Sequence, residues 1–217
     1  NDGAELVKVQ AETEALVDER SLEDVLKVTP KVVKEAAHKL KSGKSDPVFS
    51  FSSDCFKNAS DQMFEKLSLI IQSFLIHGHL TLPLLLATLV PIVKDKLGSI
   101  KVSKNYRSIA ISSILLKLID WTFIILFGSN FGLNDFQYAY QAGCSTTMCT
   151  WAVFETLDYF INNGSEVFIC AMDMTAAFGL TLHSLLFRKM NAAVFIRLFI
   201  FIYMNQTANV RWNGKLS

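Results

Sequence analysis

The stretch that most constrains the fold is a run of six consecutive apolar residues, Val167 to Met172, which ends at Asp173. Because polar residues do not alternate with apolar ones in this run, we expect a central β-strand that is covered on both faces. A carboxylate at the mouth of such a strand is held rigidly while its oxygens reach solvent, which suits a ligand of a hard metal ion. The alternative is an aspartate that starts a turn or caps the next helix.

Charge is unevenly distributed along the chain, although the net charge is only +1. Residues 92–107 carry five basic side chains against one acid, and residues 174–217 carry five against none. Local positive segments on a near-neutral chain suit a groove that binds a polyanion. The alternative is a set of scattered, solvated lysines and arginines.

The apolar content of 51% raises the question of a membrane. The longest uncharged stretch, residues 67–93, is interrupted by polar residues and by two prolines, so we expect no membrane-spanning segment. The four cysteines form no C-x-x-C pair, and no signal peptide precedes them. We therefore expect reduced thiols in an intracellular chain.

Helical periodicity dominates the rest of the sequence. Residues 1–28 show weak periodicity with Ser21 as an N-cap, and stronger patterns predict helices over residues 29–42, 60–77, 113–127, 145–162, 182–190 and 193–204. Residues 84–110 predict a β-hairpin with a basic turn, and residues 208–214 predict the first arm of another hairpin with a type I′ turn. Gly43-Lys44-Ser45 is not a P-loop, because His38 occupies the place of the required glycine.

Three motifs resemble the reverse transcriptase of non-LTR (LINE-type) retrotransposons. The first is Met172 to Phe178 followed by His183-Ser-Leu-Leu, and the second is Leu-Val-Pro-Ile, a basic loop and Asn105 to Ile109. The third is Gln137 to Thr146. The chain departs from the family at Ala176, where the family has lysine, at Gly179, where it has aspartate, and at Gln141, where it has arginine.

The resemblance implies an α+β fold, namely a partial right-hand polymerase made of the fingers and the front half of the palm. We expect it to be rich in helices, with a small antiparallel sheet. The expected divisions are an N-terminal linker or helical segment at residues 1–28, a fingers-like region at residues 29–165 that contains the basic hairpin 84–110, and a partial palm at residues 166–217.

The resemblance also implies the site residues. Asp173 is expected to be catalytic and to bind Mg²⁺ together with the backbone carbonyl of Met174, and Phe178 is expected to lie under the sugar of the incoming nucleotide. Lys94 and Arg107 flank the turn of the predicted hairpin, where they could grip a triphosphate. The alternatives are a core phenylalanine at Phe178 and a solvated basic hairpin.

By this resemblance the partners are an RNA template, a DNA primer and deoxynucleoside triphosphates. Nucleotide addition uses two Mg²⁺ ions, and the family supplies two further aspartates from a later Ala-Asp-Asp hairpin. No Asp or Glu follows Asp173 in this sequence. We therefore expect a polymerase fragment that is inactive as this chain, and the alternatives are a non-catalytic nucleic-acid-binding remnant, a helical membrane or interaction protein, and a chain that folds poorly.

Overall fold

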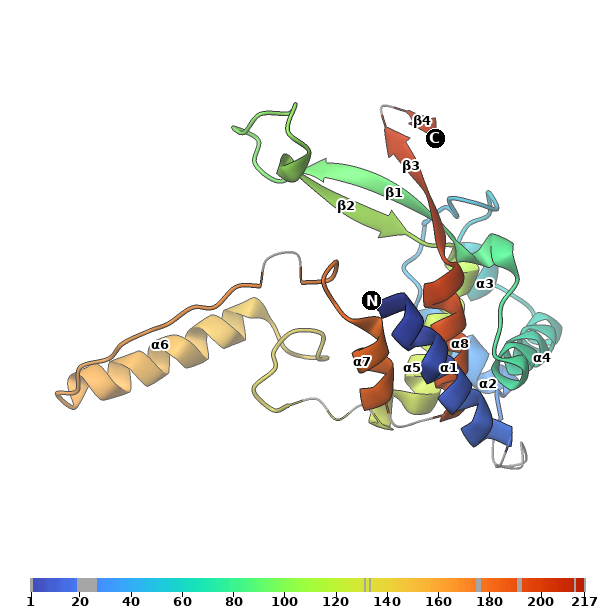
Figure 1. Cartoon of the computed structure of the whole chain (residues 1–217), viewed down its shortest axis with the longest axis horizontal. Helices are drawn as coiled ribbons and strands as arrows, with labels where there is room; N and C mark the ends of the chain where they lie inside the picture. Colours follow the sequence, from blue (N-terminus) through green and yellow to red (C-terminus); the bar gives the residue numbers. More distant parts are fainter. Residues whose placement is uncertain are drawn as a thin grey trace. The chain divides into compact units, whose positions relative to one another are not determined.

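The computed structural model describes residues 2–18, 27–130, 132, 134–174, 177–190, 193–212 and 214–216. The chain divides into unit 1, which comprises Asn1–Gly128 and Leu182–Ser217, and unit 2, which is Ser129–Thr181. Figure 1 labels the elements. Those of unit 1 are α1 (Asp2–Asp18), α2 (Pro30–Lys39), α3 (Asp54–Lys57), α4 (Asp61–His77), η2 (Leu82–Leu85), β1 (Leu86–Val93), η3 (Ser103–Asn105), β2 (Tyr106–Ile111), α5 (Ile114–Phe127), α7 (His183–Lys189), α8 (Ala193–Asn205), β3 (Thr207–Trp212) and β4 (Lys215–Leu216).

Three helices of unit 1 begin where the sequence predicted, but α2 ends at Lys39 and not at the predicted Ser42. The side chains of Thr29, Ser60 and Ser113 each accept a hydrogen bond from a backbone N–H in the first turn of α2, α4 and α5. Such caps satisfy donors that the helix itself leaves unpaired. Gly78 ends α4 in the left-handed conformation, with a φ of 68°. The predicted cap Ser21 lies outside the described residues.

One hydrophobic core joins helices from distant parts of the sequence. Val33 of α2, Ile71 of α4, Leu118 of α5 and Leu198 and Ile200 of α8 are all fully buried. Each such side chain contributes about 1.5–3 kcal/mol relative to an exposed one. Helix α8 packs into the same core as α2, α4 and α5. The strand that follows it, β3, therefore starts at a defined position beside the other strands of unit 1.

Helix α1 packs against α7 and α8 through polar contacts as well as apolar ones. The carboxylate of Asp2 accepts hydrogen bonds from the backbone N–H groups of His183, at 3.1 Å, and Ser184, at 3.3 Å, and from the Ser184 hydroxyl. The Ser184 hydroxyl, together with these backbone donors, lowers the pKa of Asp2. Arg188 of α7 lies 2.8 Å from the Glu5 carboxylate. The N-terminal helix thus caps α7, whose own N-cap residue provides no side-chain hydrogen bond.

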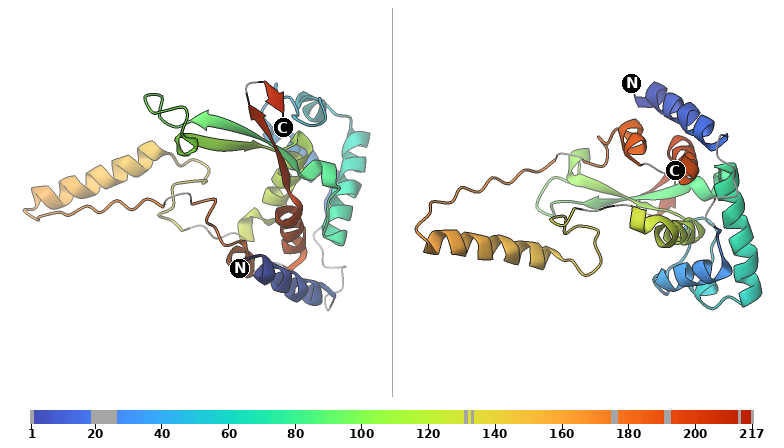
Figure 2. Two further views of the ribbon diagram at one scale, coloured as in Figure 1. Left: turned by 45° about the horizontal axis from the view of Figure 1, so that its top comes forward. Right: turned by 90° about the horizontal axis from the view of Figure 1, so that it is seen from below.

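The strands of unit 1 form a mixed sheet in the order β2-β1-β3-β4. β1 and β2 form the predicted hairpin, and β3 and β4 form the second hairpin, but β1 and β3 are parallel. The prediction of a purely antiparallel sheet was therefore wrong. The reason is that β1 follows η2 and β3 follows α8, and both strands leave the same helical core in the same direction (Figure 2). The α+β class and the richness in helices are confirmed.

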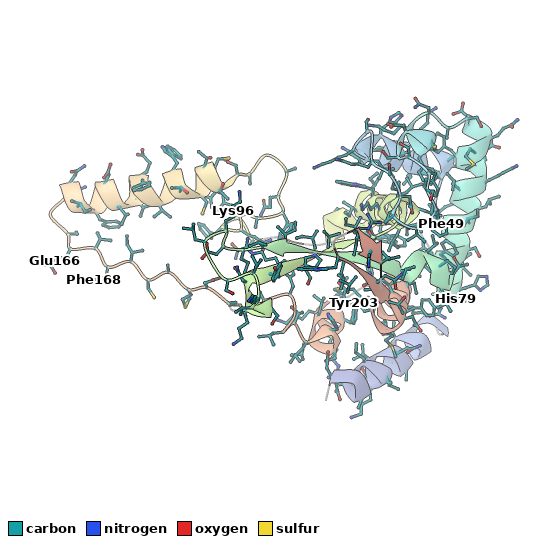
Figure 3. The ribbon with its side chains drawn as sticks, turned by 90° about the horizontal axis from the view of Figure 1, so that it is seen from above. Phe49, His79, Lys96, Glu166, Phe168 and Tyr203 are labelled. Atoms are coloured by element: carbon teal, nitrogen blue, oxygen red, sulfur yellow. The ribbon has the colours of Figure 1, made fainter. Side chains whose placement is uncertain are left out.

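Unit 2 consists of α6 (Thr146–Asn162) and the segments on either side of it. Ser145 caps α6 as predicted, because its hydroxyl accepts a hydrogen bond from the Met148 N–H at 3.2 Å. The predicted central strand at residues 167–172 was wrong, since residues 165–174 form no strand. Phe168, labelled in Figure 3, is 91% exposed and Met172 is 93% exposed. A buried central strand needs a hydrogen-bonded strand on each edge, and the strands that the structure describes pair only within unit 1.

Candidate functional site

The turn of the β1–β2 hairpin is cross-linked by one side chain, that of Asn105. Its Oδ1 accepts from the Asp95 N–H at 3.0 Å, and its Nδ2 donates to the Asp95 carbonyl at 2.9 Å and to the Ser99 carbonyl at 3.3 Å. The Tyr106 hydroxyl donates to the carbonyl of Ile100 at 2.8 Å. These bonds hold the turn in one conformation, so the cations that it carries have defined positions.

The register of the sheet places three cations on one face. Arg107 of β2 is opposite Ile92 of β1. Lys94 donates its backbone N–H to the carbonyl of Asn105 at 2.7 Å, which continues the ladder beyond β1. Because side chains alternate along a strand, Lys94, Ile92 and Arg107 emerge on the same face. Leu89 lies on the opposite face of β1 from Ile92, and it pairs with Val210 of β3. The next residue of β3, Arg211, therefore emerges on the same face as Lys94, Ile92 and Arg107.

The sheet and its turn carry far more positive than negative charge. Residues 86–111 and 207–216 contain seven basic side chains, all exposed, against the single acid Asp95. Asp95 accepts from the Leu97 N–H at 2.9 Å. None of the seven cations forms an ion pair with a described residue. The fold thus brings together basic residues from the two positive segments of the sequence, and Figure 3 shows Lys96 in the turn.

The opposite face of the sheet carries an aromatic pair. The rings of Tyr106 on β2 and Trp212 on β3 lie 5.2 Å apart between centroids and meet edge to face, with an interplanar angle of 65°. Trp212 is 52% exposed, and Lys215 is its cross-strand partner. Aromatic rings beside cations are a common surface for stacking nucleic-acid bases. Both faces of the sheet therefore carry groups that nucleic acid binds.

The predicted palm, residues 166–217, is divided between the two units: its predicted site residues lie in unit 2, whereas Leu182–Ser217, like Lys94 and Arg107, belongs to unit 1. Asp173, Met174 and Phe178 are all exposed, and Phe178 is 83% exposed. The alternative of a core phenylalanine is therefore not what the structure shows. A single site that combines these residues with the hairpin stays a prediction.

Asp173 by itself does not form a site for Mg²⁺. This ion requires several oxygen ligands in near-octahedral geometry. Within the described ranges, no group of three or more His, Cys, Asp or Glu side chains is placed to hold a metal ion. Asp173 lies on an exposed segment without regular structure rather than at the end of a buried strand. The donor set does not fit the ion, and we derive no catalytic step through a metal.

Sequence reasoning missed the importance of three residues of the sheet and its turn. Asn105 was part of a motif, but its role as the cross-link of the turn depends on the folded hairpin. Arg211 and Trp212 precede an Asn-Gly turn signal, which predicts a hairpin. That signal does not say which strand the hairpin joins, so the proximity of Trp212 to Tyr106 could not be predicted.

A comparison of the sequence with protein-family models finds no family that matches, and a comparison with curated proteins finds no similar sequence. In the described part of the chain, no helix has both the length and the apolar character needed to cross a membrane.

Proposed function

We propose that this chain is a nucleic-acid-binding part of an RNA-directed DNA polymerase of the non-LTR retrotransposon type. In this proposal the sheet of unit 1 holds the phosphate backbone of an RNA template and a DNA primer, and this chain alone adds no nucleotides. The observation that carries the proposal is the exposed, unpaired positive charge of the β1–β2 hairpin and β3. The order of the sequence motifs supports the polymerase class.

The arrangement of the cations favours a phosphate backbone as the ligand. Lys94 and Arg107 share a face with Arg211, and apolar side chains such as Ile92, which is 51% exposed, lie among them. Arginine binds two phosphate oxygens with a planar fork, whereas lysine acts as a point charge. Since the turn is cross-linked, little conformational entropy is lost when phosphates bind.

Salt dependence gives the sharpest test of this binding. If all seven cations contact phosphates of a duplex, the logarithm of the association constant should fall with the logarithm of the salt concentration at a slope of about −6. Affinity would then fall about a thousandfold or more between 50 and 200 mM salt. Fluorescence anisotropy with a labelled RNA–DNA primer-template measures the slope. Binding that does not respond to salt would contradict the proposal.

Matched variants locate the binding on the sheet. The double variant Lys94→Ala/Arg107→Ala should weaken binding and reduce the magnitude of the slope by about 2. The control Lys31→Ala/Lys66→Ala removes two exposed charges from α2 and α4 and should leave both values close to those of the unchanged chain. Equal effects of the hairpin and control variants would show that binding follows net charge and not the sheet.

A primer-extension assay separates a polymerase from a non-catalytic binder. The purified chain is incubated with a primed RNA template, deoxynucleoside triphosphates and Mg²⁺, the ion that the family resemblance implies. We expect salt-sensitive binding without extension, because among the described residues no cluster of three or more acids, histidines or cysteines includes Asp173, and a two-metal site needs several such ligands. Template-dependent extension would overturn the inference that this chain alone adds no nucleotides. It would leave the proposal that the sheet binds nucleic acid unaffected.

A further inference from the structure

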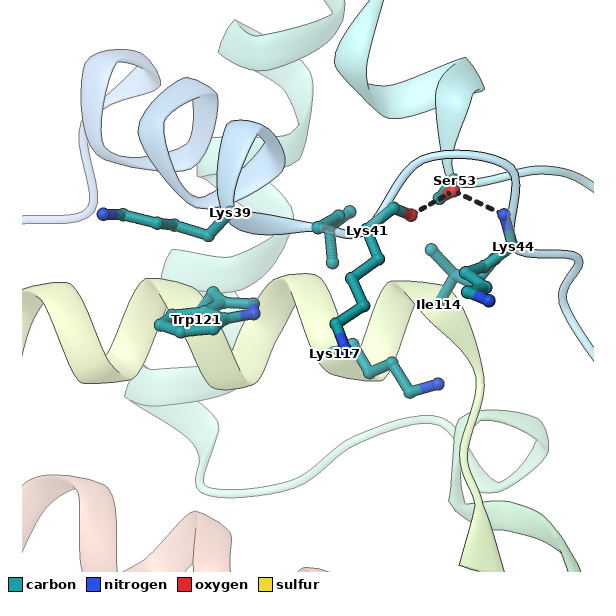
Figure 4. A pocket seen from close by; sticks show the side chains of 8 residues that line it. Lys39, Lys41, Lys44, Ser53, Ile114, Lys117 and Trp121 are labelled. Carbon is teal, nitrogen blue, oxygen red and sulfur yellow. Dashed lines mark hydrogen bonds between the residues drawn. The ribbon is translucent and has the colours of Figure 1, made fainter. Parts of the chain in front are cut away.

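A second positively charged site lies among the helices of unit 1, away from the sheet. Four lysines and a tryptophan line a pocket of about 320 Å³ between α2, the loop after it and α5 (Figure 4). Sites for small molecules span about 300–1,000 Å³, so this pocket lies at the lower end of that range. The lining residues are Lys39, Leu40, Lys41, Lys44, Ser53, Ile114, Lys117 and Trp121.

One wall of the pocket is a single face of α5. Ile114, Lys117 and Trp121 follow one another at intervals of three and four residues, which places them on the same side of the helix. Ile114 is buried, whereas Lys117 and Trp121 are partly exposed. This wall thus offers an apolar floor, an aromatic ring and a cation to the same ligand.

The other wall is a loop that hydrogen bonds hold in place. The Ser53 hydroxyl donates to the Lys41 carbonyl at 2.8 Å and accepts from the Lys44 N–H at 3.1 Å, as the dashed lines in Figure 4 mark. The buried carboxylate of Asp46 accepts from the Ile114 N–H at 2.6 Å, which ties the loop to the start of α5. Lys41 and Lys44 are therefore presented from a fixed backbone.

The protein neutralises the positive charge of the pocket only in part, since the carboxyl of Asp120 on α5 lies near Lys117. In the part of the chain that the structure describes, none of the four lysines forms an ion pair. The acids of the same loop have other partners: Asp46 binds backbone N–H groups, and Asp54 accepts from the Gly43 N–H at 2.9 Å. Four like charges around one cavity repel one another, and a polyanion would relieve that repulsion.

We propose that this pocket binds a nucleoside phosphate, with the phosphates on the lysines and the nucleoside against Trp121 and Ile114. A phosphate alone would satisfy the cations but would leave the aromatic and apolar wall unused. The ligand could be a free nucleoside triphosphate or one unit of a single strand of RNA, since both present the same groups. The proposal is independent of the sheet.

The test uses the full chain with Trp151→Phe and Trp212→Phe, which leaves Trp121 as the only one of three tryptophans. Quenching of its fluorescence then reports ligands that reach the pocket. The probes are adenosine triphosphate, a short single-stranded RNA and inorganic triphosphate. We expect saturable quenching by one or both nucleoside-bearing probes, and at least tenfold weaker binding of inorganic triphosphate.

Charge variants in this background decide the location. Lys41→Met/Lys44→Met should weaken binding at least tenfold, and the control Lys31→Met/Lys66→Met, which removes the same charge from exposed positions on α2 and α4, should change it less than twofold. Saturation by the triphosphate or by the RNA identifies the source of the ligand. Equal loss in the pocket and control variants, or inorganic triphosphate as the tightest probe, would overturn the proposal.

Discussion

The partly buried carboxyl of Asp120 on α5 gives the most quantitative prediction. Burial raises its pKa from an ordinary value of 3.8 to about 6, and the nearby Lys117 opposes this rise only in part. The folded state therefore holds a proton that the unfolded state releases between about pH 4 and 6, so stability falls as pH rises through that range. Above pH 6 the cost is about 3 kcal/mol, since each pKa unit corresponds to about 1.4 kcal/mol. Asp120→Asn, which cannot ionise, should be more stable than the unchanged chain at pH 7.5 by about 2–3 kcal/mol.

Urea unfolding followed by circular dichroism at pH 4 and pH 7.5 measures this difference. The gain from Asp120→Asn should be largest at pH 7.5 and should nearly vanish at pH 4, where the native carboxyl is already protonated. Glu65→Gln removes an acid from an exposed position on α4 and controls for net charge. A gain of the same size at both pH values, or a loss of stability at pH 7.5, would refute the reasoning from burial.

Three further perturbations test the contacts that organise unit 1. Gly78→Ala should destabilise the fold by about 1–2 kcal/mol in urea titrations, because the residue has a φ of 68° and its Cβ would lie 3.1 Å from Arg197; an unchanged midpoint would contradict this. Asp2→Ala should expose α1 to proteolysis, because it removes the carboxylate that accepts a hydrogen bond from Ser184. Lowering the pH through the lowered pKa of Asp2 should do the same in the unchanged chain, since it protonates that carboxylate. Asn105→Ala should speed hydrogen exchange in the turn of the β1–β2 hairpin, and unchanged rates there would show that the cross-link is dispensable.

The sequence predicted the helices well because the information that specifies them is local. Thr29, Ser60, Ser113 and Ser145 lie at helix starts, and their side chains bind backbone groups only a few residues away. The β1–β2 hairpin was predictable for the same reason, since its strands adjoin one turn. The parallel pairing of β1 with β3 joins residues about 120 positions apart, such as Leu86 and Thr207, and no local pattern indicates it.

The contrast between α5 and the run at residues 167–172 shows why equally apolar segments differ in predictability. A helix pairs its own backbone groups internally, so α5 needs only a capped start and neighbouring helices to be buried, and both are present. The backbone N–H and C=O groups of a strand find hydrogen-bond partners only in neighbouring strands. The apolar pattern of a strand indicates that both of its faces must be buried, but it does not indicate which elements bury them. Asp173 was inferred as a fixed ligand only because the run before it was inferred as a strand. The prediction of a strand that holds Asp173 therefore failed, whereas the hairpin that carries Lys94 and Arg107 rests on local pairing and is present. The roles assigned to these three residues stay predictions.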